Sequence, residues 1–190
     1  MRTGFVAAIF VTGGLAISAV PVLRLQARTV PAGTRFNVLL QTLLDSTKVK
    51  QDQRFETAIL EDVKAQDQVV LEIGSVIRGF VSSVKPALKD GRAGGQLTLS
   101  FDELRLGDRS VRLRASVINV LDPKRPDESR RATTASVVGG GSLGLAPLLD
   151  VMVNAGGTIV STDSSDVKLP VGVVLRIRLE QPLEIPASAR

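Results

Sequence analysis

The chain of 190 residues contains no histidine, cysteine, tryptophan or tyrosine, and its aromatic residues are six phenylalanines. Without histidine or cysteine, the usual zinc, haem, copper and iron–sulfur sites are excluded, so we expect no cofactor and no metal. The same absences exclude Ser-His-Asp and Cys-His nucleophile systems. With so few aromatic platforms for stacking bases, we also expect no nucleic-acid partner. The composition therefore argues against an enzyme.

The first 27 residues have the order of a secretory signal peptide. Arg2 is followed by an uncharged apolar run and then by small residues, and we expect cleavage after Ala27 or after Ala19. Residues 5–23 carry no charge and approach the ~20 residues that span a bilayer, so an uncleaved inner-membrane anchor is the alternative. In both cases the rest of the chain is expected to be exported, into the periplasm. The absence of cysteine predicts that it is not a lipoprotein.

Residues 28–190 are predicted to form a single β domain. Apolar and polar residues alternate with the period-two pattern of half-buried strands, most clearly over 97–102, 111–117 and 173–180, and more weakly over 35–43, 54–60, 69–73 and 76–84. Glycine-containing turn sequences separate several of these runs. We therefore predict an all-β fold, a small antiparallel β-barrel or sandwich, carrying a short glycine-rich insertion.

Three segments repeat one pattern, in which a glycine precedes a predicted strand. They are Val30-Pro-Ala-Gly-Thr34, Leu169-Pro-Val-Gly-Val173 and, more loosely, Leu71-Glu-Ile-Gly-Ser75. Glycine suits this position because it adopts a positive φ just before the extended run. We interpret the first two segments as related edges of one barrel. Chance repetition of apolar–turn–strand units in a β protein is the alternative.

Two segments interrupt the β pattern. Residues 122–131 are polar, contain two prolines and are predicted to be an exposed mobile loop. Residues 137–160 form the glycine-rich insertion, and its middle, 147–153, is predicted to be a short helix with Pro147 in the first turn. The apolar side chains of the insertion are the candidate interaction segment: Leu143, Leu145, Leu148, Leu149, Val151, Met152 and Val153.

Several motif matches have simpler structural explanations. Residues 139–144 match G-x-G-x-x-G, but the strand–helix–strand context of a dinucleotide site is missing. Ser82-Ser-Val-Lys85 matches S-x-x-K, but in a strand residues three apart point to opposite faces. Asp163 and Asp166 lack the ligand density of a calcium loop, so we interpret residues 161–166 as a solvated turn.

The order of features over residues 30–115 resembles the periplasmic β domain of the TrbI-like family, the scaffold subunits of conjugation and type IV secretion machines. The matching segments lie at 30–34, 39–46, 55–63, 69–79, 95–104 and 108–113. The resemblance implies a compact β-barrel without enzymatic activity. Full-length members also have a proline-rich linker and a helical antenna that crosses the outer membrane. Here Arg28 leads directly into the β domain, and residues 137–160 are too short for two membrane-crossing helices, so the resemblance is to a short stand-alone variant.

Two functions remain open at this point. The first is a non-enzymatic exported scaffold or interaction protein, which docks to an envelope protein or to itself through a strand edge or the apolar insertion. Membrane contact would be made through the N-terminus or the insertion. The alternative is a periplasmic β-barrel that holds a lipid, a glycan or another small envelope ligand inside the barrel or at its mouth.

Overall fold

The computed structural model describes residues 28–65, 68–126 and 145–186, and the expected signal segment lies outside them. The described residues contain strands and no helix, which confirms the predicted all-β class. The strands are β1 (Arg28–Val30), β2 (Arg35–Leu40), β3 (Leu44–Asp45), β4 (Arg54–Ile59), β5 (Val63–Ala65), β6 (Gln68–Leu71), β7 (Val76–Lys85), β8 (Gln96–Leu106), β9 (Arg109–Pro126), β10 (Leu145–Pro147), β11 (Val151–Val153), β12 (Thr158–Ser161), β13 (Lys168–Leu169), β14 (Val174–Leu179) and β15 (Leu183–Ile185).

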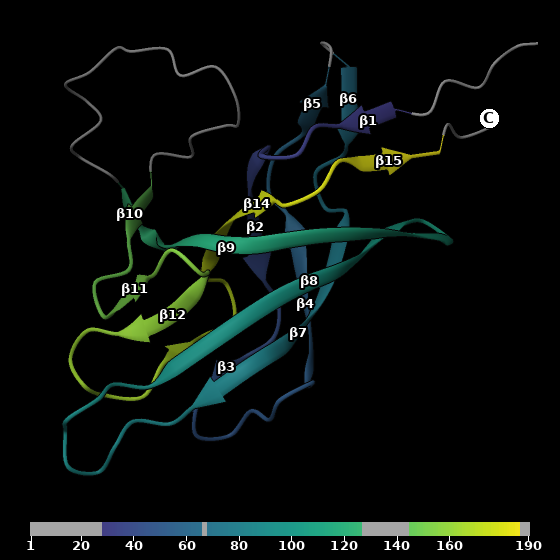
Figure 1. The fold of residues 1–190 in the computed structure, drawn as a ribbon. Helices are drawn as coiled ribbons and strands as arrows, with labels where there is room; N and C mark the ends of the chain where they lie inside the picture. Colours follow the sequence, from purple (N-terminus) through teal and green to yellow (C-terminus); the bar gives the residue numbers. More distant parts are fainter. Residues whose placement is uncertain (1–27, 66–67, 127–144, 187–190) are drawn as a thin grey trace, which may run out of the picture.

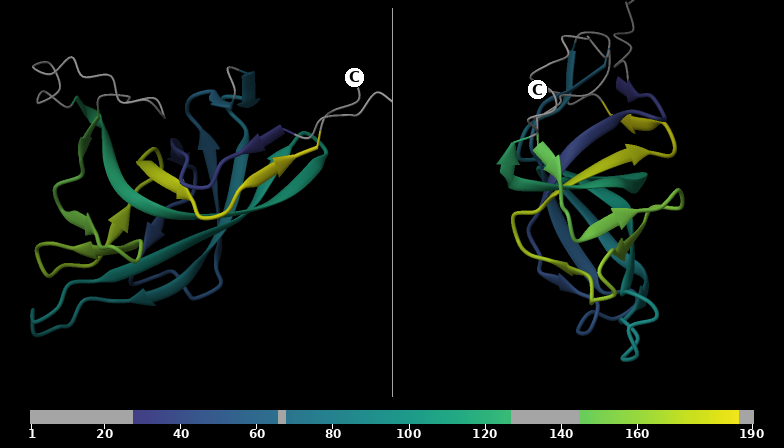
Figure 2. Two further views of the ribbon diagram at one scale, coloured as in Figure 1. Left: turned by 45° about the horizontal axis from the view of Figure 1, so that its top comes forward. Right: turned by 90° about the vertical axis from the view of Figure 1, so that its left-hand side faces the viewer.

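Six antiparallel strands close into a barrel. The large sheet has the order β10-β9-β14-β2-β4-β7-β8-β12-β11, and an additional pairing between β8 and β9 closes the six strands from β9 to β8 on themselves (Figure 1). Short ribbons extend it: β1 pairs with β15, β3 with β13, and β5 with β6. The barrel prediction is confirmed, and each predicted run overlaps a strand. Beside the barrel, β10, β11 and β12 form a small side group (Figure 2).

The prediction of a helix over 147–153 is wrong. Pro147 ends β10, a turn covers residues 149–150, and Val151 begins β11. Both halves of this segment find partner strands, since β10 pairs with β9 and β11 pairs with β12. The pairing satisfies their backbone groups in extended form, and the β-branched Val151 and Val153 suit a strand better than a helix.

The predicted loop over 122–131 is wrong in its first half. Residues 122–126 continue β9, where Pro126 lies opposite Leu145 and Leu121 opposite Pro147 in β10. The side chains of Pro123 and Lys124 are exposed, so the polar composition that suggested a loop is compatible with a strand that projects into solvent. Residues 127–131 lie outside the described residues.

Side chains fill the interior of the barrel. Its largest buried members are Phe36, Phe55 and Phe101, surrounded by buried valine, leucine and isoleucine side chains from all six strands. The rings of Phe55 and Phe101 meet edge to face, with centroids 5.4 Å apart. Between them in the sheet lies Gly79 of β7, in register with Phe55 on one side and Phe101 on the other. The missing side chain of Gly79 leaves the room that the two rings occupy.

The repeated glycine segments form one type of turn, as predicted. Gly33, Gly74 and Gly172 have φ angles of 84°, 84° and 92°. Each glycine N–H donates to the carbonyl oxygen of the last residue of a neighbouring strand. The N–H of that last residue donates in return to the carbonyl oxygen of the residue that follows the glycine. The pairs are Gly33 N–Leu179 O with Leu179 N–Thr34 O, Gly172 N–Leu40 O with Leu40 N–Val173 O, and Gly74 N–Ile59 O with Ile59 N–Ser75 O, all 2.8–2.9 Å. We call these bracketing turns.

A fourth bracketing turn escaped the sequence analysis because it has no glycine. Asp52, with φ of 65°, takes the glycine position: its N–H donates to Val81 O at 2.8 Å, and Val81 N–H donates to Gln53 O at 3.0 Å. The four turns act in two reciprocal pairs. The turns before β2 and β14 bracket each other's strands, and so do the turns before β4 and β7.

The two reciprocal pairs give the barrel an approximate two-fold symmetry. Strands β2, β14 and β9 in one half correspond to β4, β7 and β8 in the other, although their order along the chain differs. Each half has a bulge at the corresponding place: the β14–β9 register shifts between Arg176 and Ile177, and the β7–β8 register shifts between Arg78 and Gly79. The halves meet where Ser100 lies opposite Ser116. Residues between the bracketing turns and the bulges of one half therefore have counterparts in the other.

We predict that alanine has different effects at two of these glycines. Gly172→Ala should lower the free energy of unfolding by roughly 1–2 kcal/mol, since no atom lies within 4 Å of the added Cβ and the cost is the positive φ alone. Gly79→Ala should cost roughly 3 kcal/mol, because its Cβ would overlap the Ser100 carbonyl oxygen and lie 2.6 Å from the Phe55 ring. Urea unfolding measures both changes.

Asp52→Gly is the control for the turn. Relief of the positive φ offsets the entropy cost of glycine, so we expect a change within about 1 kcal/mol. Equal losses for Gly172→Ala and Gly79→Ala would contradict the packing role of Gly79.

Candidate interaction surface

The structure separates the candidate interaction segment into buried and exposed members. Leu149 and Met152 are 67% and 58% exposed. The others described are at least half-buried: Leu145, Leu148, Val151 and Val153, of which the last three pack against the hydrophobic core. Leu143 lies outside the described residues. The insertion therefore contributes as much to the core as to the surface.

Strand alternation explains which side chains face outward. Met152 of β11 lies opposite Val160 of β12, which is half-buried. The residues before and after Met152, and those before and after Val160, face the interior. Leu149 sits in the turn before β11, and Thr162 fixes this turn. The Thr162 Oγ1 hydroxyl donates to Leu149 O at 3.1 Å, and its N–H donates to Asp150 O at 3.0 Å. We call Leu149, Met152 and Val160 together the β11 surface.

The hairpin that carries the β11 surface is anchored on both sides. On one side β12 pairs with β8, with Thr158 opposite Thr98, and their hydroxyls are 2.9 Å apart. On the other side a Cβ on Gly157 would lie 3.2 Å from Ser116 Cβ, so the hairpin turn approaches β9 closely. The Asn154 Oδ1 accepts hydrogen bonds from two N–H groups within this turn. The β11 surface is therefore held by a braced hairpin between β8 and β9.

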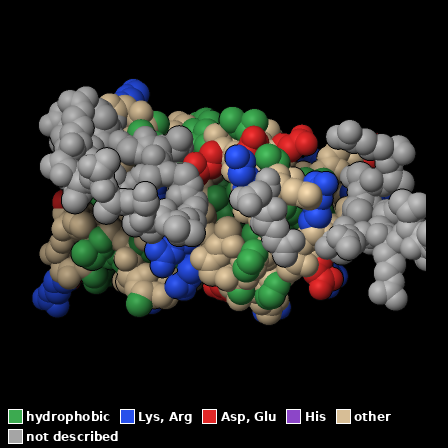
Figure 3. Space-filling model, turned by 90° about the horizontal axis from the view of Figure 1, so that it is seen from above, with side chains coloured by type: hydrophobic (Ala, Val, Ile, Leu, Met, Phe, Trp, Pro, Cys, Tyr) green, Lys and Arg blue, Asp and Glu red, His purple; other side chains and the backbone are tan. Residues whose placement is uncertain are grey.

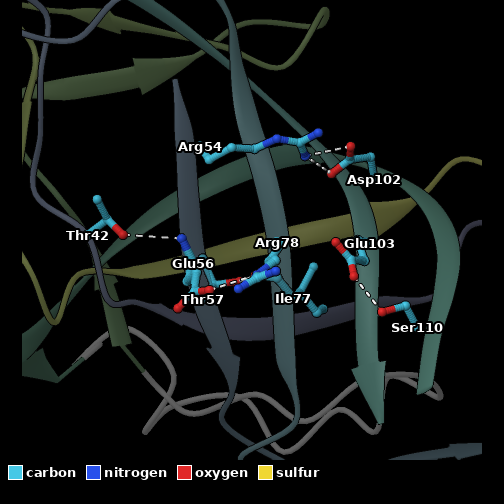
Figure 4. A network of polar contacts seen from close by, with 9 residues as sticks. All are labelled: Thr42, Arg54, Glu56, Thr57, Ile77, Arg78, Asp102, Glu103 and Ser110. Carbon is cyan, nitrogen blue, oxygen red and sulfur yellow. Dashed lines mark hydrogen bonds and ion pairs between the residues drawn. The ribbon is translucent and has the colours of Figure 1, made fainter. Parts of the chain in front are cut away.

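The outer face of β4, β7 and β8 carries paired charges (Figure 4). Arg78 Nε lies 2.7 Å from Glu56 Oε1, and Arg54 Nη1 donates to both carboxylate oxygens of Asp102 at 2.8 and 2.7 Å. The Ser110 hydroxyl donates to Glu103. Arg78 and Glu56 meet across the neighbouring strands β7 and β4, which is a stabilising arrangement in a sheet. Arg54 of β4 reaches past β7 to Asp102 of β8. Each of these charged side chains therefore has a partner of opposite charge or a hydrogen-bond donor.

One end of the barrel has an open cleft of about 930 Å³. Arg28, Glu72 and Arg105 line it together with residues of the turns before β7 and after β8 and with apolar residues of β6 and β15. The Arg28 Nη1 donates to Val69 O at 3.2 Å. On the face seen in Figure 3, basic, acidic and apolar side chains are interspersed. Sequence reasoning missed this cleft because its walls come from segments far apart in the chain, and no motif marks them.

The acidic turn at 161–166 is used for structure. Asp163 Oδ1 accepts from the hydroxyls of Ser161 and Ser165 and from the Ser165 N–H, and these bonds lower its pKa to about 2. Asp166 Oδ1 accepts from Ser46 Oγ at 3.0 Å and from Ala87 N–H at 2.8 Å. Within the described ranges, no group of three potential metal-ligating side chains gathers. Asp163 therefore holds its own turn in place, and Asp166 joins this turn to the loops that contain Ser46 and Ala87.

A buried polar contact lies outside the core, on the outer face of β2. Asn37 is fully buried, and its Nδ2 donates to Glu61 Oε1 at 2.8 Å while its Oδ1 accepts from Arg176 Nε at 3.1 Å. Burial raises the pKa of Glu61, and the hydrogen bond from Asn37 opposes this shift.

No family model matches the chain, and no curated protein is similar to it. The part of the chain that the structure describes contains no helix long and apolar enough to cross a membrane.

We predict opposite pH dependences from Asp163 and Glu61. The pKa of Asp163 is lowered on folding, so its carboxylate stabilises the fold above the unfolded pKa of ~3.9, and this contribution is lost as the pH falls toward about 2. The Tm should therefore fall between about pH 4 and about pH 2, and less so in Asp163→Asn.

The pKa of Glu61 is raised, so its protonation on acidification from neutral pH favours the fold, and Glu61→Gln should lose this gain. Thermal unfolding across pH measures both, and an unchanged acid limb in Asp163→Asn would refute the first.

Proposed function

We propose that the protein is an exported, non-enzymatic interaction protein of the cell envelope that docks to another envelope protein, or to a second copy, through the β11 surface. The observation that carries the proposal is the exposure of Leu149 and Met152 on a braced hairpin outside a closed barrel. Methionine is enriched in protein interfaces and adapts to irregular partners. The surface area of these three side chains is smaller than the area buried in a standard interface, so the partner must also contact the polar residues around them.

Two arguments support a place in the envelope. The first 27 residues have the composition and order of a signal peptide or membrane anchor. The resemblance of residues 30–115 to TrbI-like scaffold subunits implies a compact β-barrel, and the domain is a β-barrel. We therefore propose that the protein is a stand-alone relative of these scaffold domains and that it acts in secretion or conjugation.

The end cleft favours a second candidate function, the binding of a small envelope ligand such as a lipid or a glycan. Its volume of about 930 Å³ lies in the range of ligand sites. The interior of the barrel is filled by Phe36, Phe55, Phe101 and their aliphatic neighbours, so a ligand would bind at the mouth and not inside. Native mass spectrometry of exported protein should then show a small bound mass.

Site-specific crosslinking tests the docking proposal. A photoreactive amino acid at position 149 or 152, in protein expressed in the bacterial envelope, should give one discrete adduct, because those side chains would lie inside the interface. Leu88 is the matched control, since it is an apolar residue of 53% exposure on a different loop. An adduct of twice the mass identifies self-association, and another mass identifies an envelope protein.

Met152→Asp should remove the adduct formed from position 149 and leave the thermal stability unchanged, because this side chain is mostly in water. Equal crosslinking from positions 88 and 152, or no adduct from 149 and 152, would rule out docking through the β11 surface.

A further inference from the structure

Two arginines face each other on the outside of the barrel. Arg35 of β2 lies directly opposite Arg178 of β14, and both are exposed. The hydrogen bond from Leu179 N–H to Thr34 O makes the adjacent pair hydrogen-bonded, so Arg35 and Arg178 occupy a non-hydrogen-bonded pair, where side chains approach most closely. Like charges directly opposite each other destabilise a sheet.

Within the described residues, no ion pair joins Arg35 or Arg178 to a carboxylate. The ion pairs found there join Arg54 to Asp102, Arg78 to Glu56 and Arg92 to Asp90. The two acidic residues that follow β4 have other partners: Glu61 accepts from Asn37, and Asp62 accepts from the N–H of Ile73. Two like charges are thus placed at opposite positions of neighbouring strands with no ion-pair partner among the described residues.

The symmetry-related half of the barrel shows how such an arginine is satisfied. Arg54 occupies the position that corresponds to Arg35, since each follows a bracketing turn and precedes a buried phenylalanine. Arg54 lies over the ring of Phe80, 5.5 Å from its centroid, and binds both oxygens of Asp102. Phe80 lies opposite Arg54 in the sheet, as Arg178 lies opposite Arg35.

Both partners of Arg54 are replaced in the other half. Arg178, opposite Ser116, takes the place of Phe80, opposite Ser100. Asp102 is the extra residue of the β8 bulge, and the extra residue of the β9 bulge is Ile118. The half that contains Arg35 therefore has a second guanidinium where its counterpart has a ring, and an isoleucine where its counterpart has a carboxylate.

We propose that Arg35 and Arg178 together bind a carboxylate supplied by an acidic segment of a partner protein, in place of the carboxylate that Asp102 supplies to Arg54. Guanidinium groups bind carboxylates through paired, charge-assisted hydrogen bonds. An incoming carboxylate removes the repulsion between the two arginines and gains these bonds. This site is separate from the β11 surface and does not depend on it.

Binding of a fluorescent hexaglutamate peptide to the full-length protein at low salt tests the site. Arg35→Gln and Arg178→Gln should each weaken binding roughly tenfold, since each removes hydrogen bonds to the carboxylate as well as one charge. Arg112→Gln is the matched control, because Arg112 is exposed on β9 and its loss changes the net charge equally. It should weaken binding less than twofold. An equal loss in all three variants would show general charge attraction and overturn the proposal.

Ile118→Asp recreates the arrangement of the other half. Its carboxylate should satisfy Arg35 from within the chain, so we expect loss of peptide binding of at least tenfold, while Ile118→Asn binds as the native chain does. If Ile118→Asp does not fold, the arginine variants still decide. Unchanged binding in a folded Ile118→Asp would contradict the proposed equivalence. Displacement of the peptide by millimolar inorganic phosphate, with no displacement by millimolar glutamate, would assign the arginines to a phosphate ligand and overturn the acidic segment.

Discussion

The barrel depends on four short backbone turns that hold the ends of its strands. In each bracketing turn, one N–H and one carbonyl form hydrogen bonds with the carbonyl and the N–H of a single residue near the end of the neighbouring strand. These bonds fix the register between β2 and β14 and between β4 and β7, and a slip of one residue would move every core side chain to the outside. Closure between β8 and β9 then leaves few unpaired edges, which matters in a chain that has no disulfide to restrain it.

With the backbone so constrained, the two halves differ mainly in side chains. Inside, Phe55 and Phe101 fill the space over Gly79, whereas the other half places Phe36, Ile177 and Val117 at the corresponding positions. A glycine and a large ring in one half are thus balanced by two medium side chains in the other, which keeps the interior close-packed. Outside, one half pairs opposite charges across its strands while the other sets Arg35 against Arg178. The symmetric backbone therefore carries two chemically distinct faces.

Strand alternation predicted most of the barrel, because a half-buried sheet imposes a period of two on any sequence such as that of residues 111–117. Glycine predicted three bracketing turns, but the fourth was missed since Asp52 tolerates the same positive φ. The insertion was misread because apolar residues from Pro147 to Val153 fit a helix until their partner strands are known. Of the candidate site, Leu149 and Met152 proved exposed. The end cleft and the arginine pair depend on residues distant in sequence, and no local pattern reports such a juxtaposition.

The ribbon of β1 and β15 has a mechanical consequence. Arg28 lies opposite Ile185, so both ends of the described domain lie side by side (Figure 2). Tension applied between the two ends would load the hydrogen bonds of this ribbon one after another, as a zipper opens, and would not shear them all together. The ribbon would therefore peel at low force, while β2 and β14 behind it stay locked by the turns at Gly33 and Gly172. The domain therefore resists a force applied to β2 and β14 far better than a force applied between its two ends.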